Sequence, residues 1–260
     1  MSDEPAHSPS LPEPDGPISG VFSTEVMSTV GTGGTKRRMS QKVYMFVEDL
    51  GDGRVSVKPI NKNFVPTGKK AVLTREKLLK DYLPEPSMYM HSVYPAMRAL
   101  EAAAERGDAH REKDELFSAE FEYKGALRVD EEHVRSTFGL GLVYLRRNEL
   151  RSAEAVFKRI VALESAFEQR HKHLFNDFGI QLRKHGLFVQ AMEYYGRAVQ
   201  LTGSDEHLFF NLARAAFESG RLREAGEHVA KALDLNPGLD EARRLRQAVD
   251  KAAEEKKIVL

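Results

Sequence analysis

The feature that most constrains this chain is a block of helical sequence that occurs three times between residues 137 and 237. In each copy, apolar and small residues recur three and four positions apart, over two stretches separated by a short turn. The first copy comprises Thr137, Leu140, Gly141, Tyr144, Asn148, Ala153, Phe157, Ile160, Val161 and Leu163. The second comprises Phe175, Phe178, Gly179, Leu182, Gly186, Ala191, Tyr195, Ala198, Val199 and Leu201. The third comprises Phe209, Leu212, Ala213, Ala216, Gly220, Ala225, Val229, Ala232, Leu233, Leu235 and Pro237.

Each copy predicts two antiparallel helices that pack on each other and on the next pair. The spacing between copies is nearly constant, with 38 residues from Gly141 to Gly179 and 34 from Gly179 to Ala213. The four additional residues correspond to about one helical turn. We therefore expect the second helix of the first copy to extend through Ser165 and Ala166.

The repeat continues weakly on both sides. Upstream, five residues precede the second-helix stripe of the first copy by 34 positions and predict a degenerate copy: Ala119, Tyr123, Ala126, Leu127 and Val129. Its first helix is expected over about residues 88–105, followed by a stretched turn. Downstream, a single apolar stripe on an otherwise charged segment predicts a terminal capping helix: Ala242, Leu245, Val249 and Ala252.

These blocks resemble the tetratricopeptide repeat over about residues 110–257. The first copy matches the family pattern best, through Leu140, Gly141, Tyr144, Ala153 and Phe157. Two features depart from the pattern. Pro closes only the third copy, and the family tryptophan is replaced by Thr137, Phe175 and Phe209. The resemblance implies a mainly α protein, with a TPR-like α-solenoid over residues 87–260 that has three clear repeats, one degenerate N-terminal repeat and a C-terminal capping helix.

The resemblance also implies a non-enzymatic scaffold or adaptor, whose concave groove holds a peptide or helix of a protein partner. Aromatic, aliphatic and Arg side chains along the first helices are typical of binding hot spots. The groove residues expected on this basis are Arg135, Phe138, Leu142, His173, Asn176, Ile180, Arg183, His207, Phe210, Arg214 and Phe217. An alternative interpretation is that residues 21–60 of the same chain cover this stripe.

No enzymatic site is expected. The carboxylates lie on charged helix faces, and no Ser/His/Asp or Lys/Glu set occurs in a recognisable context. His173 and His207 occupy equivalent positions in successive copies, but no third ligand follows in phase, so we predict neither a metal site nor a cofactor.

The region before the repeats divides in two. Residues 1–40 are rich in Pro, Ser, Gly and Thr and predict a disordered leader. Residues 41–86 predict a small module with a β-hairpin, in which runs at 43–47 and 54–58 flank an Asp-Gly turn. Residues 71–73 are expected to form a third strand, and Thr74 is expected to cap a short helix. The edge of this hairpin could pair with a partner strand or a second copy, and the oligomeric state is left open.

The formal net charge is zero, but it is unevenly distributed, at −5 over residues 1–35, +8 over residues 36–80 and −3 over the remainder. A basic segment favours an anionic partner, and nucleic acid is the alternative function that we keep open. A solvated, lysine-rich sheet edge explains the same charge without a ligand. The anion contacts that the first interpretation predicts are Lys36, Arg37, Arg38, Lys42, Lys58, Lys62, Lys69 and Lys70.

Composition excludes several other classes. The chain has 260 residues and no cysteine, which rules out a disulfide scaffold, a thiol nucleophile and a cysteine metal site. No run of apolar residues is long enough to cross a bilayer, and the N-terminus has no signal-peptide pattern. We therefore expect a cytoplasmic protein without membrane insertion.

Overall fold

The computed structural model describes residues 16–30, 37–202 and 205–256, which form two compact units, Met1–Leu100 and Glu101–Leu260. The sequence predicts the boundary after residue 86 instead. The difference arises because the segment after residue 86 packs on the sheet, where Val93 is buried against Val21 and Phe46. Each unit is described by itself below.

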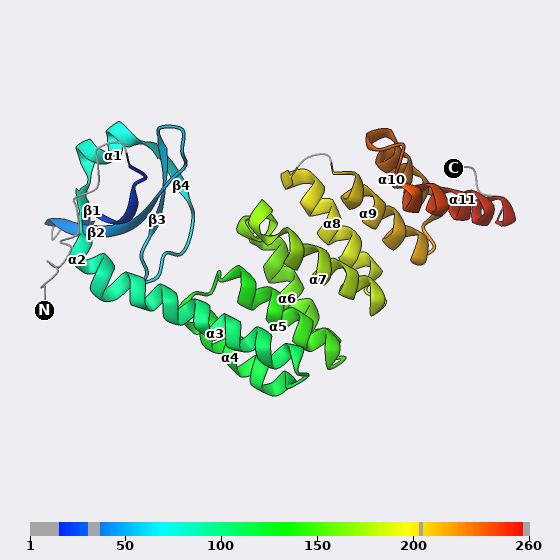
Figure 1. The fold of residues 1–260 in the computed structure, drawn as a ribbon, viewed down its shortest axis with the longest axis horizontal. Coiled ribbons are helices and arrows are strands. Elements are labelled where there is room, and N and C mark those ends of the chain that lie inside the picture. The colour runs from blue at the N-terminus through cyan, green and yellow to red at the C-terminus, as the bar shows by residue number, and fades with distance from the viewer. Residues whose placement is uncertain (1–15, 31–36, 203–204, 257–260) are drawn as a thin grey trace, which may run out of the picture. The chain divides into compact units, whose positions relative to one another are not determined.

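The first unit contains an antiparallel sheet and short helices (Figure 1). Its elements are β1 (Ser19–Val30), β2 (Arg37–Asp49), β3 (Arg54–Pro59), β4 (Ala71–Thr74), α1 (Arg75–Asp81), β5 (Leu83–Pro84), α2 (Pro86–Met88), the π-helix η2 (Tyr89–Val93) and the start of α3 (Tyr94–Glu112). The five strands are ordered β4-β3-β2-β1-β5. The predicted hairpin is confirmed, since β2 pairs with β3 in a register that places Val47 opposite Val57.

The predicted disordered leader is wrong for part of its length. Residues 19–30 form β1, which pairs with β2 along its whole length, from Ser19 opposite Glu48 to Val30 opposite Arg37. This strand is stable because Val21 and Phe22 alternate between the two faces and both are buried. Residues 1–15 and 31–36 lie outside the described residues.

The third strand and the capped helix are also confirmed. β4 pairs with β3, and the side chain of Thr74 accepts a hydrogen bond from the Lys77 amide at 3.2 Å, which caps α1. Leu78 of α1 is fully buried and closes one face of the sheet. The buried residues of this small hydrophobic core are Phe22, Val47, Val55, Val57 and Leu78.

The second unit consists of consecutive antiparallel helices, coloured green to red in Figure 1. Its elements are the rest of α3, then α4 (Leu116–Val129), α5 (Val134–Arg146), α6 (Leu150–Ala162), the short 3₁₀ helices η3 (Glu164–Phe167) and η4 (Gln169–His171), α7 (Lys172–Lys184), α8 (Phe188–Thr202), α9 (Glu206–Glu218), α10 (Leu222–Leu235) and α11 (Asp240–Glu255). The three predicted copies correspond to α5–α6, α7–α8 and α9–α10, and α11 follows them as the terminal helix.

The degenerate first copy is more regular than its sequence suggests. Its first helix, α3, continues to Glu112 rather than ending near residue 105, so the expected stretched turn is wrong. Asp114 in the turn has a positive φ of 61°. The corresponding turns of the next three pairs contain Asn148, Gly186 and Gly220, with φ of 57°, 74° and 80°. One left-handed residue therefore ends the first helix of each of these four pairs.

The four additional residues of the first clear copy do not extend its second helix. α6 ends at Ala162, and η3 and η4 occupy the insertion. Phe167 of η3 is buried, and its ring centroid lies 5.7 Å from that of Phe175 and 5.6 Å from that of Tyr194. The insertion thus leaves α-helical geometry and places this aromatic side chain in the core against α7 and α8.

Candidate functional site

The second and third clear copies bring a set of predicted groove residues to partly exposed positions. We name the α7–α9 face by these residues: His173, Asn176, Ile180, Arg183, His207, Phe210, Arg214 and Phe217. His173, His207 and Arg214 are exposed, whereas the others are half-buried. Phe210 and Phe217 also contact the core beneath them, so they anchor the face as well as line it.

Ion pairs at both ends hold α7 alongside α9. Near their N-terminal ends, Lys172 Nζ donates to Asp205 Oδ2 at 3.0 Å, and Asp205 also accepts hydrogen bonds from the first amides of α9. Near their C-terminal ends, Arg183 Nη1 donates to both oxygens of Glu218, at 2.6 and 2.7 Å. Because these pairs lie at matching ends, the two helices run parallel and in register.

Glu218 is shared by two guanidinium groups. Arg214 Nε donates to Glu218 Oε1 at 3.2 Å, the same oxygen that Arg183 contacts. The Arg183 side chain is only 12% exposed, whereas that of Arg214 is 46% exposed. One carboxylate therefore partners two cations, and Arg214 is the one that remains accessible to a ligand.

Two predicted groove residues on α5 are not accessible. Phe138 is fully buried and Leu142 is nearly so, and both belong to the main helical core. The reason is close packing of α7 on α5, since a Cβ placed on Gly141 would lie 2.6 Å from the Phe178 ring. The Phe138 ring meets the Phe178 ring edge-on, with centroids 5.6 Å apart. The expectation that Phe138 and Leu142 line a groove is therefore wrong.

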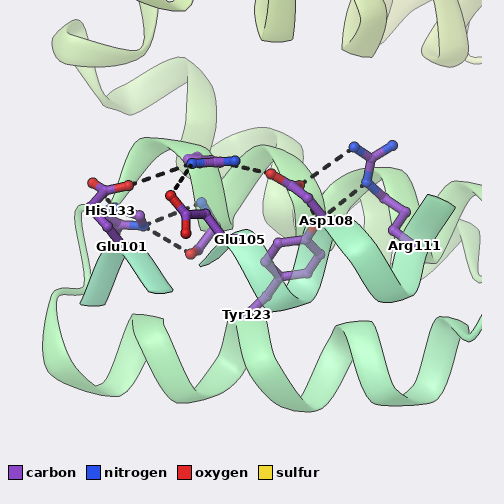
Figure 2. Close-up of polar contacts among 8 residues, drawn as sticks. Glu101, Glu105, Asp108, Arg111, Tyr123 and His133 are labelled. Atoms are coloured by element: carbon purple, nitrogen blue, oxygen red, sulfur yellow. Dashed lines mark hydrogen bonds and ion pairs between the residues drawn. The ribbon is translucent and has the colours of Figure 1, made fainter. Parts of the chain in front are cut away.

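Arg135, the remaining predicted residue on α5, is held by three acidic side chains of α3, which Figure 2 labels as Glu101, Glu105 and Asp108. Its Nε donates to Asp108 Oδ2 at 2.7 Å. Its Nη1 lies 3.6 Å from Glu101 Oε2 and 4.0 Å from Glu105 Oε1. Arg135 thus joins two neighbouring helices.

Tyr123 connects the same network to α4. Its hydroxyl donates to Asp108 Oδ1 at 2.5 Å and accepts from Arg111 Nε at 3.2 Å. Figure 2 shows its ring below Asp108, with Arg111 to the right of both. Burial raises the pKa of the Tyr123 phenol well above its usual value, and the bond to Asp108 raises it further. The phenol therefore stays a donor at neutral pH.

His133 extends this network on the Glu101 side. Its Nδ1 lies 2.8 Å from Ser136 Oγ and accepts from the Ser136 amide, so the imidazole caps α5. Its Nε2 lies 3.2 Å from Glu101 Oε1, and this hydrogen bond lowers the pKa of the Glu101 carboxyl. The sequence analysis did not identify Asp108, Tyr123 or Glu101 as a group. Of these three residues the sequence analysis named only Tyr123, as part of the degenerate copy.

The predicted anion contacts are dispersed over the first unit. Lys36 lies outside the described residues, and Arg37 and Arg38 begin β2. Lys42 forms an ion pair with Glu85, which also accepts from Ser23 Oγ at 2.8 Å. The other four stand on β3 or in the connection to β4: Lys58, Lys62, Lys69 and Lys70. Contact with nucleic acid at these residues stays a prediction.

Within the described part of the chain, no three His, Asp or Glu side chains gather closely enough to hold a metal ion. A search of the same residues for a helix long and apolar enough to cross a membrane finds none.

The stacked antiparallel helix pairs define an α-solenoid of the kind that serves as a protein-interaction scaffold. Residues 206–239, which contain α9 and α10, match the family model described as tetratricopeptide repeat. With four helix pairs in series ahead of α11, the C-terminal part of this chain is a tetratricopeptide-repeat region.

Several solved structures are similar to this chain over part of its length. The structure titled as a functional characterization of Pseudomonas aeruginosa pilF shares 19% identity at a TM-score of 0.46, covering 61% of this chain and 70% of that one. YrrB, titled a TPR protein with an unusual peptide-binding site, shares 26% identity at a TM-score of 0.42, covering 57% of this chain and 74% of that one. MamA shares 20% identity at a TM-score of 0.40, covering 58% of this chain and 96% of that one. No curated protein sequence matches this chain.

Proposed function

We propose that the α7–α9 face binds a peptide or a helix of a protein partner. The observation that supports this most is the arrangement of two parallel helices, fixed at both ends by ion pairs, with aliphatic, aromatic and Arg side chains between the pairs. A surface that is ordered before binding loses less conformational entropy when a ligand arrives. The face is therefore a preorganised recognition surface.

The chemistry of the face fits a ligand that combines apolar and acidic groups. Ile180, Phe210 and Phe217 supply apolar contact area in half-buried positions. Arg214 supplies an accessible guanidinium that shares Glu218 with Arg183 and can also donate hydrogen bonds to a ligand carboxylate. Aromatic and Arg side chains carry much of the affinity at protein interfaces.

The test begins with peptides selected from a displayed random library on the immobilised full chain. The affinity of a selected peptide is then compared between the wild type and R214E. This change leaves the Arg183–Glu218 pair in place, so the fold is expected to persist and its circular dichroism to match the wild type. We expect R214E to weaken binding at least about tenfold, since a reversed charge at a contact costs 1.4 kcal/mol or more.

The matched control is R223E, which makes the same charge reversal at an exposed position on α10. It is expected to bind the selected peptides with wild-type affinity. Equal losses in R214E and R223E would show a non-specific charge effect and contradict the proposed site.

A further inference from the structure

The outer edge of β1 is only partly covered by its neighbour in the sheet. β5 pairs with β1 at Phe22 and Ser23 alone, whereas β1 continues to Val30. Among the described residues no strand pairs with residues 24–30 on that side. Thr24 still has a contact on this side, since its hydroxyl donates to the carbonyl of Asp81, the last residue of α1, at 3.1 Å. The open edge therefore runs from Glu25 to Val30.

The direction of the backbone groups along this edge follows from one hydrogen bond. The Glu85 amide donates to the Val21 carbonyl at 2.8 Å, which fixes Val21 as a residue that bonds on the β5 side. In an antiparallel strand this role alternates with a period of two residues. The amides and carbonyls of Glu25, Met27 and Thr29 consequently point outward, away from β2.

The composition of β1 does not protect this edge. Proteins usually blunt an open edge with lysine, proline, a bulge or a very short strand. β1 contains no Lys, Arg or Pro, and its only charge is Glu25. Glu25 lies opposite Lys42 and accepts a hydrogen bond from Ser40 Oγ at 2.8 Å, so its charge is already accommodated within the sheet. Val26 and Met27 are 47% and 64% exposed.

The other edges of the same sheet are protected in the usual ways. β4 is only four residues long and follows Lys69 and Lys70. β2 extends beyond its pairing with β3, but this stretch contains Arg37, Arg38 and Lys42. The contrast indicates that the β1 edge is kept open for pairing.

We infer that the β1 edge pairs antiparallel with the β1 edge of a second copy of this chain, about a two-fold axis at Met27. In this register Met27 lies opposite its counterpart, and Glu25 lies opposite the uncharged Thr29 of the second copy. Each opposed pair of outward residues exchanges two N–H···O bonds, which gives about six across the junction. The two sheets become one continuous sheet.

Charge selects this register of β1 against the β1 of a second copy. Like charges directly opposite each other destabilise a strand pair, and a two-fold axis at Glu25 would oppose two carboxylates. The axis at Met27 avoids this contact and uses the whole open edge. A closed two-fold junction is also self-limiting, because a single contact uses the stretch from Glu25 to Val30 of both copies.

The absence of cysteine from the chain permits a direct test by cross-linking. Residues directly opposite in a hydrogen-bonded pair have Cα atoms about 5.5 Å apart, within the range of a disulfide. M27C in the full chain is expected to form a covalent dimer rapidly under mild oxidation. E25C is the register control, because its counterpart would lie about 13 Å away along the strands. Cross-linking of E25C in preference to M27C would overturn the inference.

Sedimentation equilibrium gives the independent measurement. The wild type is expected to reach twice the monomer mass of 29.3 kDa. M27K places two lysines opposite each other at the axis and should weaken the dimer at least about tenfold, whereas V72K on the short β4 strand should leave it unchanged. Circular dichroism verifies that each variant is folded. A wild type that stays monomeric at its highest soluble concentration, or a dimer that M27K does not weaken, would overturn the inference.

Discussion

The ring of Tyr123 lies against the backbone of Gly107 so closely that a Cβ added to Gly107 would come within 2.6 Å of a ring carbon. Gly139 meets the same ring from α5, and a Cβ there would lie 2.2 Å from it. Tyr123 therefore occupies a slot between two helices that only glycine permits. The slot aligns the phenol with Asp108, from which the polar network of Figure 2 extends to Arg135.

Alanine at either glycine should destabilise the second unit. Overpacking of a tight core costs about 1–3 kcal/mol, and the fully buried Tyr123 ring has no room to move. We expect both G107A and G139A to lower the urea midpoint of unfolding. G196A is the control, because no atom lies within 4 Å of a Cβ at that helical position. It should stabilise the protein by up to about 1 kcal/mol. An equal change in the urea midpoint at all three positions would contradict the close packing of Tyr123 against Gly107 and Gly139.

The stability of the second unit should fall in alkaline solution. The folded-state pKa of Tyr123 is raised, so its contribution to stability is complete below its unfolded pKa of about 10 and is lost as pH rises above that value. Each such tyrosine contributes at most about 1.4 kcal/mol per pH unit. Urea unfolding from about pH 9 to about pH 11 measures the slope.

The variant Y123F removes this titrating group and should make the alkaline fall shallower. Tyr194 and Tyr195 also have raised pKa values because of burial, so part of the fall should remain. A slope that Y123F leaves unchanged would show that Tyr123 ionises normally in the folded protein.

Removal of the Asp108 carboxylate should lower the free energy of unfolding more than removal of the Arg135 side chain does. D108A leaves the Tyr123 hydroxyl without its acceptor and Arg135 without its shortest contact, and an unsatisfied buried group costs about 1–3 kcal/mol. Arg135 is 36% exposed, so R135A should cost less. Thermal unfolding of the two single variants and the double variant measures the coupling, and strict additivity would argue against a connected network.

Asp205 should stabilise α9 in two separable ways. Burial would raise its pKa, but Lys172 and the His207 amide lower it overall, so the group is a carboxylate at neutral pH. D205A removes the helix cap and should cost about 1 kcal/mol. D205N keeps a capping oxygen and loses only the charge contact with Lys172, so it should cost less. Chemical denaturation gives the stability of the two variants. If D205A and D205N lose the same stability, the whole contribution of Asp205 comes from its contact with Lys172.

The repeat was largely predictable because its signal is periodic. Four helix pairs share small residues and turns at nearly constant spacing, and three of them were evident from apolar residues alone. The first pair was harder to recognise, since Gly107 stands between Arg106 and Asp108, and Asp114 occupies the turn position that holds glycine in the third and fourth pairs. The 34-residue distance from Ala119 and Tyr123 to Ala153 and Phe157 located its second helix, whereas its first helix was predicted to end too early.

Two features could not be obtained from sequence. Burial of Phe138 depends on how closely α7 approaches α5, and helical spacing specifies only which side of a helix a residue occupies. β1 was missed because its glycine, serines and threonines resemble a linker, whereas its stability comes from pairing with β2. Local composition does not record such long-range pairing.

Hydrogen exchange of the full chain with and without a selected library peptide tests the central claim most directly. Binding at the α7–α9 face predicts slower exchange of amides in α7 and α9, with little change in α4 and in the sheet. The R214E variant should lose this protection at the same peptide concentration. Protection confined to the sheet or to α4, with α7 and α9 unaffected, would contradict the proposed function.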